Sequence, residues 1–209
     1  AVHALLDDSP RHLLAELSDA VAALAAEVGR PLSLIAEDDR NDPRTVAPTA
    51  EGGLGMTAQW ADDVHHAIHA LLTGERHGYY VDFGTPEALA TALTRVFVHD
   101  GGWSTFRGRP WGRPVPDGVD GHRFVVFASD HDQVGNRALG DRPSARLDAG
   151  GLAIEAALVL CSPCTPMLFM GEEWGASTPW LFFTDHAEPE LAAAVRAGRE
   201  AEFGGHGWA

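Results

Sequence analysis

Short apolar runs alternate with longer helical patterns along most of this chain. Residues 32–36, 56–60, 124–128 and 167–170 have the length and apolar character of buried strands. Apolar residues recur at helical spacing over 9–28, 62–72, 86–98, 147–160 and 189–203. Because a strand followed by a helix is the repeating unit of parallel sheets, this order predicts an α/β fold built from parallel βα units.

The number of these units limits the architecture. Four strands in 209 residues are too few for a closed eight-stranded barrel of about 250 residues. The chain therefore forms either an open doubly wound sheet or the second half of a barrel. A stretch rich in Gly, Pro and Trp at 101–121 is expected to be a long excursion that packs on the rest of the domain.

The charge balance excludes several classes of partner. The chain has 30 acidic and 15 basic side chains, and its formal charge is −15. This charge repels a phosphate backbone and an anionic membrane, so we expect neither nucleic acid nor a membrane as a partner. No run of 18 apolar residues and no basic-then-apolar leader is present, which predicts a soluble, cytoplasmic protein.

Two cysteines stand in a C-x-x-C arrangement at Cys161 and Cys164. A redox motif of this kind opens a helix after a strand, whereas here the pair follows a helical pattern and precedes an apolar run. We interpret both as small packing residues in a tight turn.

Polar residues follow every predicted strand. They are Glu37, Asp38 and Asp39 after the first, Asp62 and Asp63 after the second, His131 and Asp132 after the third, and Glu172 and Glu173 after the fourth. Any one group could be a helix cap or a solvated loop. Because all of them follow the same end of a strand, they favour an active site at the carboxyl ends of a parallel sheet.

Paired carboxylates at such an edge suit glycoside hydrolysis. One carboxyl group protonates the leaving oxygen, and another attacks the sugar or stabilises its developing positive charge. Glu37 comes directly after an apolar strand and has the partly desolvated setting that suits a proton donor.

Four segments make the interpretation more specific. They are LIAEDDRNDPR at 34–44, QWADDVHH at 59–66, FASDHDQVGN at 127–136 and TPMLFMGEEWGASTPWLFFTDH at 165–186. Together they resemble the maltooligosyltrehalose trehalohydrolase family of the α-amylase superfamily, and the resemblance runs from Ala1 to about Trp208. It implies a glycosidase that acts on a maltooligosaccharide with a terminal trehalose unit and needs no metal or organic cofactor.

The resemblance also implies roles for individual residues. Glu37 matches the general acid/base, and Asp132 matches the carboxylate that stabilises the transition state. The positions that match sugar contacts are His3, Asp62, Asp63, His65, His66, His131, Gln133 and Asn136.

One departure concerns the nucleophile. In that family it is an aspartate in the string Arg-Leu-Asp-Ala-Val-His, whereas this sequence opens with Ala1, Val2 and His3. We therefore expect the nucleophile directly before Ala1, with the rest of the barrel upstream, and we expect the 209 residues alone to be inactive. Residues 1–209 would be a partial catalytic domain, the C-terminal half of a (β/α)8 TIM barrel from the end of strand four through strand eight and its helix.

Three other functions remain open from the sequence. A branching or trehalose-forming enzyme of the same superfamily would share these motifs. A metallohydrolase is the second alternative, because His65 and His69 have the i,i+4 spacing of a zinc site, with His66 beside them. However, no glutamate follows the first histidine to act as a base. A carbohydrate-binding fragment without catalysis is the third alternative.

Overall fold

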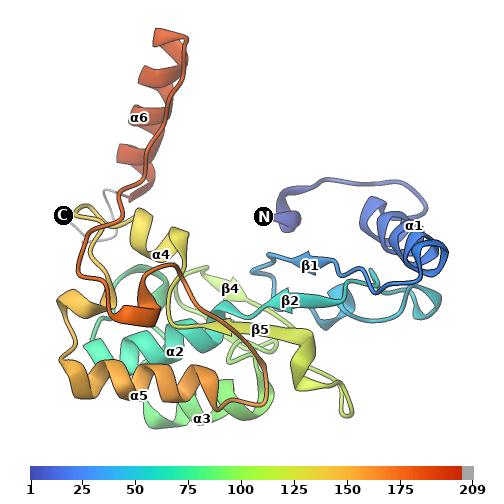
Figure 1. Cartoon of the computed structure of the whole chain (residues 1–209), viewed down its shortest axis with the longest axis horizontal. Coiled ribbons are helices and arrows are strands. Elements are labelled where there is room, and N and C mark those ends of the chain that lie inside the picture. Colours follow the sequence, from blue (N-terminus) through green and yellow to red (C-terminus); the bar gives the residue numbers. More distant parts are fainter. Residues whose placement is uncertain (204–209) are drawn as a thin grey trace.

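The computed structural model describes residues 1–203, which contain both helices and strands as the sequence predicts (Figure 1). The helices are α1 (Leu13–Val28), α2 (Asp62–Thr73), α3 (Pro86–Arg95), α4 (His131–Gly135), α5 (Ala149–Leu160) and α6 (Pro189–Phe203). The strands are β1 (Ile35–Ala36), β2 (Ala58–Trp60), β3 (Trp103–Ser104), β4 (Arg109–Pro110), β5 (Phe124–Phe127) and β6 (Thr165–Met167). Residues 204–209 of the predicted domain, including Trp208, lie outside the described part. Within residues 1–203, no helix has both the length and the apolar character needed to cross a bilayer.

The main sheet has four parallel strands in the order β1-β2-β5-β6. Apart from the separate hairpin of β3 and β4, each strand pairs with the strand of this sheet that follows it in the sequence. A doubly wound sheet instead reverses its strand order at a switch point. Sequential parallel order is that of a (β/α)8 barrel. The prediction of the C-terminal part of such a barrel is therefore confirmed, and the doubly wound alternative is not.

The core lies between this sheet and the helices α2, α3 and α5, which lie on the same side of it (Figure 1). All four residues of β5 are buried, and the Phe124 ring packs edge-on against Phe97 at 5.5 Å between centroids. A smaller cluster joins Leu14 of α1 to Ala36 and Met56. By contrast, α6 projects away from the sheet (Figure 1).

Three predicted boundaries are wrong for local reasons. The first helix begins at Leu13 and not at residue 9, because the His12 side chain caps it by accepting the Leu14 N–H at 3.1 Å. The last strand covers Thr165–Met167 and not 167–170, because these three residues pair with β5 and the chain then turns. The segment after β5, for which no helix is predicted, forms the short helix α4, since Asp130 and Gln133 close a capping box.

The excursion at 101–121 folds back over the strand ends. Its hairpin of β3 and β4 is antiparallel. The Trp111 indole N–H donates to the Asp39 carbonyl at 2.9 Å, and the Arg107 guanidinium contacts the Asp39 carboxylate at 2.9 Å. The excursion therefore packs against the loop that follows β1.

Both cysteines are free thiols. Cys164 is buried, as expected for a packing residue, whereas Cys161 is exposed at the end of α5. The prediction that both pack in a tight turn is therefore right for Cys164 and wrong for Cys161.

A cavity of about 400 Å³ lies between α5 and the segment after β6. Its lining is mostly apolar, but Glu155 of α5 reaches it and is only 5% exposed. The Glu155 Oε1 atom has no hydrogen-bond partner within residues 1–203. Burial, and after it the negative charge of Glu172, raises the pKa of Glu155 to about 7.

Glu155→Gln is expected to stabilise the protein at neutral and alkaline pH and much less at acidic pH. The folded state binds the Glu155 proton more tightly than the unfolded state, whose pKa is 4.5, so wild-type stability falls as the pH rises from about 4.5 through about 7. We expect urea unfolding of the full-length protein at pH 8 to show the variant more stable by roughly 3 kcal/mol, and by less than about 1 kcal/mol at pH 5. Glu27→Gln, on the exposed face of α1, is the control. A Glu155→Gln variant no more stable than wild type at pH 8 would contradict this account.

Candidate active site

The candidate acids follow neighbouring strands of the parallel sheet. Glu37 comes directly after β1, Asp62 begins α2 just after β2, and Asp132 lies in the first turn of α4 after β5. Since β1, β2 and β5 are adjacent and parallel, their carboxyl ends meet at one edge. The fold therefore brings the three side chains to the same end of the sheet.

Glu37 lies against the first residues of the chain. Its Oε2 atom is 2.7 Å from the Ala1 nitrogen, and its carbonyl accepts the Val2 N–H at 2.9 Å. The Glu37 side chain keeps 36% of its surface exposed. Two residues further, His3 Nδ1 lies 3.4 Å from the Asp39 carboxylate. The opening segment thus runs beside the end of β1 and brings His3 to the same edge.

Asp132 is held by the capping box that begins α4. Its N–H donates to Asp130 Oδ1 at 2.7 Å, while the Asp130 N–H donates to Gln133 Oε1 at 2.9 Å. The main chain is fixed by these bonds, but half of the Asp132 side-chain surface is exposed. Asp132 therefore presents a half-exposed carboxylate from a rigid turn.

Aromatic rings flank His131, the neighbour of Asp132. The His131 ring lies 6.4 Å from the Trp60 ring and 6.5 Å from the Trp180 ring, measured between centroids. His131 Nε2 is also 3.4 Å from the Asp132 carboxylate. Such rings offer flat apolar surfaces beside an acid, an arrangement that suits a sugar ring.

The edge concentrates negative charge. Burial, and after it the charges of Asp130 and Asp39, raises the pKa of Asp62 well above its ordinary value. Burial likewise raises the pKa of Asp130 to about 6, although the N–H of Asp132 opposes this shift. Burial and the neighbouring negative charges therefore favour the protonated form of Asp62 more than that of an exposed aspartate.

Gln133 and Asn136 are partly buried and already engaged. The Gln133 side chain completes the cap of α4, and Asn136 Oδ1 accepts a hydrogen bond from Arg199 of α6 at 2.9 Å. Both side chains hold α4 in place at the edge.

Asp63 lies behind the edge and is 4% exposed. Its Oδ2 atom accepts three hydrogen bonds: from Asn41 Nδ2 at 2.9 Å, from Val98 N–H at 2.8 Å and from His99 N–H at 2.9 Å. This carboxylate joins two loops to the start of α2, which favours a supporting role over direct contact with a ligand.

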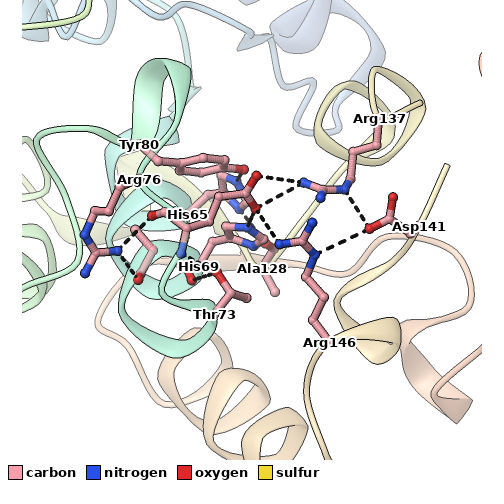
Figure 2. Close-up of polar contacts among 11 residues, drawn as sticks. His65, His69, Thr73, Arg76, Tyr80, Ala128, Arg137, Asp141 and Arg146 are labelled. Carbon is pink, nitrogen blue, oxygen red and sulfur yellow. Dashed lines mark hydrogen bonds and ion pairs between the residues drawn. The ribbon is translucent and has the colours of Figure 1, made fainter. Parts of the chain in front are cut away.

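His65 and His66 are also buried, at 0% and 6% exposure. His65 uses both ring nitrogens, one on the Ala128 carbonyl and the other on the Tyr80 hydroxyl, and His69 bonds to Glu75 at 2.8 Å (Figure 2). The histidine spacing that suggested zinc therefore serves a network of hydrogen bonds within the protein. Within residues 1–203, the one cluster with metal-ligand spacing is His3, Asp38 and Asp39. In that cluster Asp38 already binds Arg40 at 2.9 Å.

Sequence reasoning missed two residues of this edge. Asp130 caps α4, and the Asp-x-x-Gln spacing of a capping box could have identified it. Trp180 reaches the edge from the long segment after β6, and no local pattern marks its position.

Comparisons with known proteins agree with this fold. A malto-oligosyltrehalose trehalohydrolase from Arthrobacter ramosus is 59% identical over 208 residues, covering 100% of this chain and 36% of that protein. The proteins of the same name from Mycobacterium tuberculosis and Saccharolobus solfataricus are 56% and 47% identical, covering 100% and 98% of this chain and 36% and 35% of those proteins. A solved structure from Salmonella typhimurium, assigned as an α-amylase, is 41% identical with a TM-score of 0.87, covering 99% of this chain and 35% of that one. No protein-family model matches the chain.

The chain thus spans about a third of the length of the curated relatives that it matches. The similarity nevertheless extends over nearly all of its own residues, including the strand ends that carry the candidate acids. On these identities, nearly the whole chain is similar to about a third of the malto-oligosyltrehalose trehalohydrolases.

Proposed function

We propose that this chain carries two of the three acids of a glycosidase that cleaves the α-1,4-glucosidic bond next to the terminal trehalose unit of maltooligosyltrehalose. The reaction would release trehalose. The observation that carries the proposal is the exposure of Glu37 and Asp132 at one sheet edge, where their side chains are 36% and 50% exposed. The names of the relatives supply the substrate class.

The proposed chemistry assigns one role to each acid. Glu37 donates a proton to the glycosidic oxygen and then removes one from the attacking water. Asp132 stays ionised and stabilises the positive charge that develops on the sugar in the transition state. A separate nucleophile makes the reaction retaining, with about 5–5.5 Å between its carboxyl group and that of the acid/base.

The path of the opening segment supports the expected place of that nucleophile. The Val2 N–H donates to the Glu37 carbonyl at 2.9 Å, so a residue that precedes Ala1 would lie near the proposed acid/base. We assign the nucleophile to an aspartate there. This assignment makes the 209-residue chain, taken alone, catalytically incomplete.

The residues predicted to contact the sugar fall into two groups, one at the sheet edge and one buried behind it. His3, Asp62 and His131 lie at the edge and are assigned to hydroxyl groups of the substrate, whereas Gln133 and Asn136 hold α4 in place there. The three buried members of the predicted set support these contacts from behind, namely Asp63, His65 and His66.

Replacing either acid should abolish most of the activity. In the full-length protein, Glu37→Gln removes the proton donor and should lower kcat on maltooligosyltrehalose by about 100-fold to 10,000-fold. Asp132→Asn should lower kcat by at least about 100-fold, because the charge at the transition state is lost. Trehalose release, measured by anion-exchange chromatography, checks both, and Glu27→Gln on α1 should retain wild-type activity.

Two outcomes would contradict this function. A wild-type protein that transfers glucan branches or converts maltose into trehalose, and that releases no trehalose from maltooligosyltrehalose, would have a sister activity. Full trehalose release by Glu37→Gln would remove Glu37 from the mechanism.

The third acid can be tested separately. We expect the codon before Ala1 in the natural gene to encode aspartate, and its replacement by asparagine should lower kcat as strongly as Glu37→Gln. Fresh product examined by proton NMR should carry the α-anomer at the new reducing end, as a retaining mechanism requires. A different residue at that position, or the β-anomer as first product, would overturn the assignment.

A further inference from the structure

The segment that carries Asp132 is tied to the buried side of the protein at two points. One tie is at Ala128, four residues before Asp132, and the other is at Arg137, five residues after it. Both ties lead to a polar network around α2, which Figure 2 shows. The residues of this network lie outside the proposed reaction chemistry.

The first tie is a hydrogen bond from His65. Its Nδ1–H donates to the Ala128 carbonyl, and its Nε2 accepts from the Tyr80 hydroxyl at 2.9 Å. Burial, and after it the neighbouring His69, lowers the pKa of His65 to about 3, so the ring is neutral under ordinary conditions. A neutral ring with Tyr80 as donor on one side must present its N–H to Ala128 on the other.

The second tie is an ion pair between Arg137 and Glu75, the residue that follows Gly74 at the end of α2. Arg137 Nη1 is 3.2 Å from Glu75 Oε2, and Arg137 Nε donates to Asp141 at 2.9 Å. The Arg137 and Glu75 side chains are only 8% and 3% exposed. Burial alone would raise the pKa of Glu75, but the hydrogen bond from His69 and the charge of Arg137 outweigh it and hold the pKa at about 2.

We propose that Glu75 and Arg137 are positioning residues that hold Asp132 in its catalytic place. Between the two ties, the capping box of Asp130 and Gln133 fixes the turn that contains Asp132. Moving this turn would therefore separate a buried ion pair, which is costly because each charge would be left without its partner. The catalytic part of this inference rests on the proposed role of Asp132.

The choice of side chain supports a positioning role. The guanidinium of Arg137 contacts Glu75 and Asp141 at once through different nitrogens. A lysine ammonium retains the charge but has a single nitrogen, so it cannot contact the two carboxylates through separate nitrogens. Arg146 offers a matched comparison, since it contacts the same two acids at 3.4 and 3.5 Å but is 42% exposed and lies outside the tied segment.

Arg137→Lys in the full-length protein should reduce kcat for trehalose release by about 10-fold to 100-fold while KM stays within about twofold, because a misplaced acid weakens the transition state most. Arg146→Lys should stay within about twofold of wild type in both constants. Glu75→Asp, which shortens the side chain by one methylene group, tests the same tie from the α2 side. It should likewise lower kcat and leave KM nearly unchanged.

Hydrogen exchange tests the tie without any substrate. In Arg137→Lys and Glu75→Asp, amide exchange over residues 128–136 should accelerate by about 10-fold or more, whereas α3 should exchange as in wild type. Unchanged exchange and kcat in both variants, or acceleration spread equally over all elements, would overturn the proposal. Wild-type protein that does not cleave maltooligosyltrehalose would instead overturn the proposed function, and the exchange data would still decide whether the tie exists.

Discussion

The parallel, sequential pairing of β1, β2 and β5 is the constraint on which the rest of the structure depends. Because adjacent strands run in the same direction, whatever follows each of them arrives at one edge of the sheet. Glu37 and Asp132 are 95 residues apart in the sequence, yet both follow strands of this sheet. A side chain at the opposite strand ends could not join them without a different fold.

Carboxylates gathered at one edge repel one another, and the structure reduces this repulsion in a different way for each acid. The more buried acids, Asp62 and Asp130, have raised pKa values and give up part of their charge. Asp63 is buried too, but three donors bind it. Glu37 and Asp132 remain exposed to solvent or ligand. Behind them, the charged network of Glu75 and Arg137 is itself paired, so it adds rigidity and little net charge.

The sequence predicted the order of the elements and the edge at which the acids lie, because apolar periodicity and strand-end polarity are local patterns. It could not predict that His65 faces the Ala128 carbonyl, since that contact joins residues 63 positions apart. The helix α4 was missed because five residues are too few to show helical periodicity, and only the cap of Asp130 marks it. Trp180 reaches the edge through a long segment whose one regular element is the short 3-10 helix Glu172–Trp174, and the path of this segment depends on tertiary contacts.

The central claim is that Glu37 and Asp132 act on one sugar ring at this edge. A crystal structure of the full-length Glu37→Gln variant with maltooligosyltrehalose bound tests it most directly. We predict that the side chain at position 37 lies within hydrogen-bond distance of the scissile glycosidic oxygen and that the Asp132 carboxylate contacts the same glucose ring, with His131 beside it. A substrate bound elsewhere, for example in the cavity between α5 and β6, or a ring that contacts only one of the two positions, would contradict the account.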